Sequence, residues 1–149
     1  IITEGSEERR RFMDALFSQL DHQYLLQLMQ YNRLLQQRNS LLKQMAETRL
    51  RQFDLLEILD HQLSGPAEYV FVKRKEYLEV LINQVKTRYY NIAGEQYDLQ
   101  LKYESPLLAS GFRQLLLQNR ERDLQAQRTL FTPNTLRSLL LTQLPRSFG

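Results

Sequence analysis

Residues 24–45, which read YLLQLMQYNRLLQQRNSLLKQM, decide the fold of this chain. No Gly or Pro interrupts the stretch, and its many Leu, Gln, Lys and Arg residues favour the α-helix. Apolar side chains recur at intervals of three and four residues. They are Leu28, Tyr31, Leu35, Leu42 and Met45. This spacing predicts a long helix with one apolar stripe, which requires a partner helix to cover it. A helix of a globular bundle and a helix of a coiled coil both fit the pattern.

Arg38 falls on the same stripe, between Leu35 and Leu42. A buried guanidinium without a partner costs several kcal/mol. We therefore expect Arg38 to be at least partly buried and to form a structural ion pair with a carboxylate of another segment. The candidate partners are Asp54, Asp60 and Glu76. The alternative is an exposed Arg38 whose aliphatic stem covers the neighbouring leucines.

A second amphipathic segment follows the first along the chain. The apolar pattern continues from Met45 to Leu63, with or without a break near residues 46–49. Ser64, Gly65 and Pro66 then predict a helix end and a new helix start. The following stripe consists of Phe71, Lys75, Leu78, Ile82, Val85, Tyr89 and Ile92. Two such stripes joined by a Gly-Pro corner predict an antiparallel helical hairpin, with Gly94 at its end.

The segments on either side of the hairpin are shorter. Residues 1–3 resemble the end of a strand, Ser6 can cap a first helix, and Asp21 can end it and cap the next. Tyr97, Leu99, Leu101 and Tyr103 alternate with polar residues, a pattern typical of a half-buried strand. A further helix is expected over residues 110–127. The fold class is thus mainly α, a hairpin or coiled-coil arm with a small β element.

The expected organisation has three parts. Residues 1–21 form a flanking strand end and helix, residues 22–94 the hairpin, and residues 95–149 a strand, a helix and a return segment. With 149 residues, 42% of them hydrophobic and 25% charged, the chain is long enough for one modest core. It does not begin with Met, so we expect a piece of a longer protein.

The composition also indicates the cellular compartment in which the chain is found. No apolar run approaches the ~18 residues of a membrane helix, and the N-terminus lacks the layout of a signal peptide. The absence of Cys excludes disulfides and fits a reducing cytoplasm. We therefore expect a cytoplasmic protein without a membrane partner.

The chain is mildly basic, with a formal net charge of +3 and a pI near 9.3. Clustered positive charge on an accessible face is what phosphate contacts require. The candidate DNA-binding residues are Arg9, Arg10, Arg11, Lys73, Arg74 and Lys75. The alternative is a solvated charge run, with the stem of Lys75 extending from the apolar stripe.

Catalytic and metal-binding residues are not expected in this chain. An Asp-His pair occurs twice, at Asp21-His22 and Asp60-His61. Adjacent helical residues point about 100° apart, and no third ligand is evident, so we expect no metal site. There is no Cys nucleophile, the two His are isolated from each other in sequence, and most carboxylates alternate with Arg and Lys.

Several sequence blocks together resemble one known family. They are GSEERRRFMD, YNRLLQQRNSLLK, LDHQLSG, FVKRKEYLEVL, LKYESPLL and NRERDLQAQRT, in this order over residues 5–129. These blocks resemble the RecF family of bacterial replication and repair ATPases, which is related to the SMC and Rad50 heads. The resemblance implies an ABC-type ATPase head into which a helical arm is inserted, and this chain looks like the arm with fringes of the head.

The resemblance also implies ligands and partners of a full-length protein. A RecF protein binds ATP with Mg²⁺, binds DNA near junctions of single and double strands, and cooperates with RecR and RecO. This chain departs from that pattern, because no two of its five glycines have the spacing of a P-loop. No apolar strand ends in Asp-Glu, and TPNTL stands at residues 132–136 where the family carries Gly-Pro-His-Arg-Asp-Asp.

Two functions follow as hypotheses. The first is a non-catalytic helical arm of a RecF-like DNA replication and repair protein, with no ATP hydrolysis by this chain itself and weak DNA contact. The second is a free-standing helical module that binds other proteins or self-associates through an exposed stripe.

Overall fold

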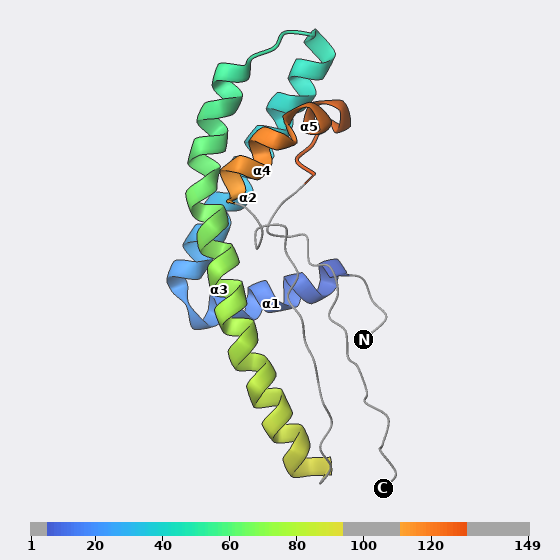
Figure 1. The fold of residues 1–149 in the computed structure, drawn as a ribbon. Coiled ribbons are helices and arrows are strands. Elements are labelled where there is room, and N and C mark those ends of the chain that lie inside the picture. Colours follow the sequence, from blue (N-terminus) through green and yellow to red (C-terminus); the bar gives the residue numbers. More distant parts are fainter. Residues whose placement is uncertain (1–5, 94–110, 131–149) are drawn as a thin grey trace, which may run out of the picture.

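The computed structural model describes residues 6–93 and 111–130 (Figure 1). The regular structure in these ranges is helical. The helices are α1 (Ser6–Leu20), α2 (His22–Thr48), α3 (Phe53–Ala93), α4 (Phe112–Gln118) and α5 (Arg120–Ala126). The mainly α fold class is confirmed. The β element predicted at residues 97–103, the strand end at residues 1–3 and the helix end at Gly94 lie outside the described residues.

Helices α2 and α3 lie side by side and antiparallel, as predicted, but the corner between them is elsewhere (Figure 1). The chain turns between Thr48 and Phe53, where Arg49 adopts the left-handed conformation with φ 57°. The hydroxyl of Thr48 donates to the carbonyl of Gln44 (2.8 Å) and accepts from the N–H of Leu50 (3.3 Å). The hydroxyl thus satisfies backbone groups that the helix end leaves open.

The corner predicted at Gly65 and Pro66 is wrong, because α3 continues through both residues. Proline inside a helix costs ~3 kcal/mol, so packing must outweigh its local preference. Buried apolar residues occur on both sides of Pro66 along one face of α3. They are Leu56, Leu63, Ala67, Val70 and Leu78, each at most 4% exposed. A corner at Pro66 would remove Ala67, Val70 and Leu78 from this face.

The second predicted stripe is shifted by one residue at its start, whereas Leu78 is buried as predicted and Val85, Tyr89 and Ile92 are exposed. The buried positions are Val70, Arg74 and Leu78, whereas Phe71 is half-buried and Lys75 is exposed. One residue is a rotation of about 100° around a helix. The shift therefore exchanges the expected environments of Arg74 and Lys75.

The core consists of three clusters placed along the hairpin. Near α1 it contains Met13, Phe17, Tyr24, Val70 and Leu78. In the middle it contains Tyr31, Leu34, Leu63, Ala67, Phe112 and Leu116. Towards the turn it contains Leu41, Leu42, Met45 and Leu56. Helix α1 thus packs at one end of the hairpin, and α4 covers its middle.

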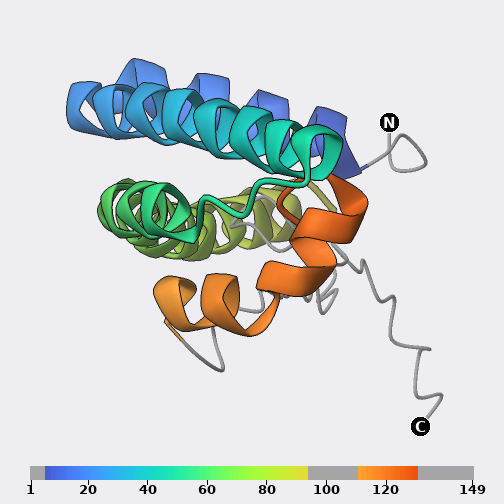
Figure 2. The same ribbon diagram turned by 90° about the horizontal axis from the view of Figure 1, so that it is seen from above.

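The junctions between helices have identifiable causes. Asp21 caps α2 as predicted, because its side chain accepts the N–H of Tyr24 at 3.2 Å. The helix expected over residues 110–127 is divided at Asn119 into α4 and α5. Helix α4 lies along α3 and α5 turns toward α2 (Figure 2).

The three-part division of the chain stays a prediction. None of the helices described is long and apolar enough to cross a membrane.

Candidate functional site

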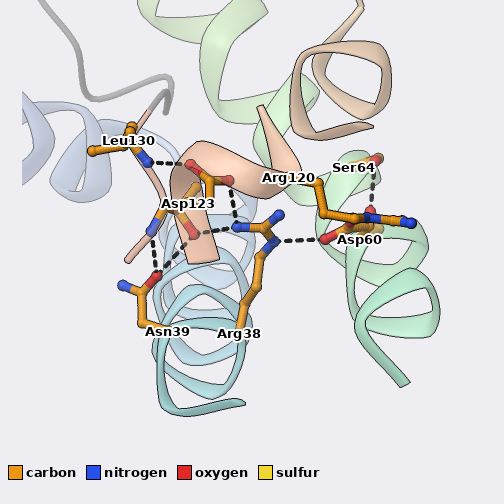
Figure 3. Close-up of polar contacts among 8 residues, drawn as sticks. Arg38, Asn39, Asp60, Ser64, Arg120, Asp123 and Leu130 are labelled. Atoms are coloured by element: carbon orange, nitrogen blue, oxygen red, sulfur yellow. Dashed lines mark hydrogen bonds and ion pairs between the residues drawn. The ribbon is translucent and has the colours of Figure 1, made fainter. Parts of the chain in front are cut away.

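Arg38, on α2, is fully buried and lies where α2, α3 and α5 meet (Figure 3). Its Nε donates to Oδ1 of Asp60 at 2.6 Å, and its Nη1 donates to Oδ2 of Asp123 at 2.9 Å. The side chains of both aspartates are at most 2% exposed. The ion pair that the sequence predicted for Arg38 is thus present, with Asp60 from the candidate list and Asp123 in addition.

The residues that follow α5 join the same network. The hydroxyl of Thr129 accepts from Nη1 of Arg38 (2.7 Å) and donates to Oδ1 of Asn39 (2.8 Å). That amide oxygen also accepts the backbone N–H of Thr129 at 2.8 Å. The backbone N–H of Leu130 donates to Oδ1 of Asp123 at 2.9 Å. Side chains from α2 and α5 therefore hold two consecutive backbone amides (Figure 3).

Arg120 adds a second positive charge beside the network. Its Nη2 lies 3.8 Å from Oδ2 of Asp60, and its guanidinium stacks 5.5 Å from the ring centroid of Phe53. Two arginines thus stand against two aspartates, so the formal charges balance. Burial raises the pKa of Asp123, while the N–H of Leu130 and the charge of Arg38 oppose the shift.

A second buried arginine, Arg74, joins α3 to α1 and α2. Its Nε and Nη2 donate to the two carboxylate oxygens of Asp14 at 3.0 and 2.7 Å. The hydroxyl of Tyr24 accepts from Nε of Arg74 (3.0 Å) and donates to Asp14 (2.5 Å). Burial raises the pKa of Tyr24, and the positive charge of Arg74 opposes this rise.

The aromatic rings beside Arg74 complete this end of the hairpin. Phe17 lies 5.8 Å from Tyr24 and 5.1 Å from Tyr77, measured between ring centroids. The hydroxyl of Tyr77 donates to Asp21 at 2.6 Å. This hydrogen bond is the main cause that lowers the pKa of Asp21. The N-cap of α2 is thereby linked to α3.

The structure brings the two predicted basic clusters to one crossing of helices. Asp14, which pairs with Arg74, stands three residues after Arg11 on α1. Arg9 and Arg10 are partly exposed. Arg11 is exposed, donates to Glu7 at 2.8 Å, and shares that carboxylate with Arg10 at 3.6 Å.

On α3, Lys75 is exposed and Lys73 donates to Glu76 at 3.0 Å. Arg74 is 1% exposed, so its assignment as a DNA-contacting residue is corrected. The physical reason is the rotation of about 100° per residue on a continuous α3, which turns Arg74 toward Asp14 and Tyr24.

The two Asp-His pairs do not come together. His22 and His61 are exposed, on α2 and α3 respectively. Asp21 binds Tyr77, and Asp60 binds Arg38. Within residues 6–93 and 111–130, no three His, Cys, Asp or Glu side chains form a group that could hold a metal ion.

Sequence reasoning missed Asp123, Asp14 and Thr129. Asp123 stands in the run Arg120-Glu121-Arg122-Asp123, which looks like a solvated charge run. The helical count from the two buried residues of α4, Phe112 and Leu116, reaches Asp123 seven residues further. That spacing is the signal that could have placed Asp123 on the buried face.

The relatives that this chain matches are DNA replication and repair proteins. The chain is 42% identical over 123 residues to the protein RecF of Flavobacterium johnsoniae, covering 83% of this chain and 34% of that protein. It is 40% identical over 134 residues to RecF of Agathobacter rectalis, covering 90% of this chain and 37% of that protein. No family model matches the chain.

Solved structures agree with the sequence relatives. A structure of the recombination mediator protein RecF-ATP in the RecFOR pathway matches with a TM-score of 0.77 and 33% identity, over 89% of this chain and 38% of that one. A second RecF structure of the same pathway matches with a TM-score of 0.80 and 31% identity, over 90% of this chain. The chain is therefore homologous to RecF and spans about a third of the length of the relatives that it matches.

Proposed function

We propose that this chain is the helical arm of its RecF-like protein and that it acts as a stiff, non-catalytic support. The observation that carries the proposal is the pair of buried arginine networks in a segment homologous to RecF. They join α1, α2, α3 and α5 through residues far apart in the chain. Such networks restrict relative motion of the helices, because bending the hairpin would separate charges that have little or no access to water.

ATP and Mg²⁺, in this proposal, are bound by other parts of the full-length RecF-like protein. The glycines of this chain lack the spacing that a phosphate-binding loop needs. We expect the 149-residue chain to show no metal-dependent turnover of ATP. Phosphate release measured with excess Mg²⁺ tests this, and saturable turnover by the pure chain would contradict it.

The surface proposed for DNA is the crossing of α1 and α3, which carries Arg9, Arg10, Arg11, Lys73 and Lys75. Arg74 supports this surface from within by binding Asp14. Cations on such a face neutralise phosphates without reading bases. Binding should therefore be weak, insensitive to sequence and steeply dependent on salt.

Replacement of Lys73 and Lys75 by Ala tests this surface. Fluorescence anisotropy on duplex DNA should show weaker binding, with the salt slope reduced by about one unit per lost phosphate contact. The matched control is Lys43→Ala with Arg49→Ala, which removes the same charge from exposed positions near the hairpin turn. If the control weakens binding and the first variant does not, the DNA contact lies at the turn.

RecO- and RecR-type partners and a cytoplasmic location also belong to the proposal, since the matched structures are of RecF in the RecFOR pathway. The competing function is a free-standing interaction module. Homology to RecF over 83% of the chain favours the arm. Sedimentation equilibrium measures self-association, and a stable dimer at micromolar concentration would favour the module.

A further inference from the structure

The first two residues after α5 are held by backbone carbonyls of the helix end, and the next two by side chains. At Gln127 the chain adopts the left-handed conformation with φ 56°. The N–H of Gln127 donates to the carbonyl of Leu124 (3.2 Å), and that of Arg128 donates to the carbonyl of Asp123 (3.1 Å). The chain therefore turns sharply, and residues 127–130, which we call the exit segment, run back toward α2.

The next two amides of the exit segment find their acceptors on side chains. Thr129 donates to Asn39 of α2, and Leu130 donates to Asp123. The hydroxyl of Thr129 is used twice, since it accepts from Arg38 and donates to Asn39. Thr129 is 9% exposed, so these bonds are shielded from competing water.

The charges are arranged so that contacts of the exit segment can be lost while the ion pair between α2 and α3 remains. Arg38 has one carboxylate partner on each side, Asp60 on α3 and Asp123 on α5. If Asp123 loses its charge, Arg38 keeps Asp60, so the pairing of α2 with α3 survives. The side-chain amide of Asn39 carries no charge, and its Oδ1 accepts from the exit segment. Loss of this amide should therefore release the exit segment without leaving a charge of the hairpin unpaired.

We infer that Asn39, Arg38 and Asp123 form a clamp that fixes the exit segment to α2. The position of the exit segment is then set by α2, from which it is separated by about ninety residues of sequence. Any rotation of α2 carries Thr129 with it, while Leu130 is held by Asp123, which is itself paired with Arg38 of α2. The hairpin and the exit segment then move as one body. This inference does not depend on the proposed binding of DNA.

Hydrogen exchange of the 149-residue chain tests the clamp. In the parent, the amides of Thr129 and Leu130 should be protected although they lie outside any helix. Asn39→Ala removes the acceptor of Thr129 and changes no charge. We expect exchange at Thr129 to become faster by about tenfold or more, while the amides of α2 and α3 keep their protection.

The matched control is Asn32→Ala, which removes the same group from an exposed position two turns earlier on α2. It should leave Thr129 and Leu130 unchanged. Asp123→Ala provides a second test, since it removes the acceptor of Leu130 and should release that amide while α2 and α3, still joined by Arg38 and Asp60, remain protected. Unchanged protection of both amides in both variants would overturn the clamp. Equal loss throughout α2 and α3 in Asn39→Ala would also overturn it, because the network would then support the whole hairpin.

Discussion

Arg38 and Arg74 are both buried and paired with aspartate, but the carboxylates around them differ in their access to water. The side chains of Asp60 and Asp123 are at most 2% exposed, whereas that of Asp14 is 16% exposed. Arg38 also serves two carboxylates, while Arg74 shares one with the hydroxyl of Tyr24. A carboxylate that retains access to water tolerates the loss of its partner better than one that does not. The comparison therefore predicts unequal effects for the same substitution.

The largest effect is expected for Arg38→Met. This change fills the space with an apolar side chain but leaves Asp60 and Asp123 charged and buried. Breaking a buried pair from one side costs about 3–5 kcal/mol in free energy of unfolding, and Arg38→Ala should cost at least as much. Urea denaturation followed by circular dichroism measures the change. A loss below about 1 kcal/mol would mean that the network does not stabilise the fold.

A matched control and a rescue sharpen this prediction. Arg33→Met replaces an exposed arginine of α2, which donates to Gln30, and should change stability by less than about 0.5 kcal/mol. Adding Asp60→Leu, Asp123→Leu and Arg120→Leu to Arg38→Met should recover much of the loss, since none of the four charges of the network then remains unpaired. Failure of that rescue would show that shape, and not charge, dominates the site.

A smaller effect is expected for Arg74→Met at the other end of the hairpin. Asp14 remains bonded to the hydroxyl of Tyr24 and keeps its exposure to water. We expect a loss of about 2 kcal/mol, near the value of hydrogen bonds to a charged group. The same denaturation experiment ranks the two variants, and an equal or larger loss than that of Arg38→Met would contradict the comparison.

The hydroxyl of Tyr24 should contribute about 1 kcal/mol, measured as Tyr24→Phe. Its pKa is raised above the ordinary 10.0, chiefly by burial. The stability that this shift gives is present below pH 10 and is lost as pH rises above it, because the unfolded tyrosine ionises first. Stability measured between pH 9 and pH 11 should therefore fall less steeply in Tyr24→Phe than in the parent. If stability depends on pH in the same way in the two chains, the hydroxyl of Tyr24 does not contribute to the network around Arg74.

The smallest effect tests the continuity of α3, which places Asp60 and Arg74 on one helix. A Cβ added at Gly65 meets no atom within 4 Å, and Gly65 is exposed inside the helix. Gly65→Ala should therefore stabilise the chain by about 0.5–1 kcal/mol. A corner at Gly65 and Pro66 would instead make this substitution destabilising. Thermal melts of the two chains distinguish these outcomes.

Some features were evident from sequence because they depend on local spacing. Counting by three and four placed Arg38 on the buried stripe, and burial of a charge required a carboxylate partner such as Asp60. The cap at Asp21 and the pairing of two long helices followed in the same way. The lesson is that a charged residue on an apolar stripe predicts a partner, since an unpaired charge is too costly there.

Other features were decided only by tertiary structure. The packing of Leu63, Ala67 and Val70 carried α3 through Pro66, so the strongest local turn signal was overridden. Packing of α3 against α1 and α2 placed Arg74 against Asp14 and Tyr24 and left Lys75 exposed. Asp123 lies 85 residues from Arg38, and no local pattern links two positions so far apart. Sequence spacing determines which face of a helix is apolar, whereas the free energy of the whole core determines where helices end and which distant groups meet on that face.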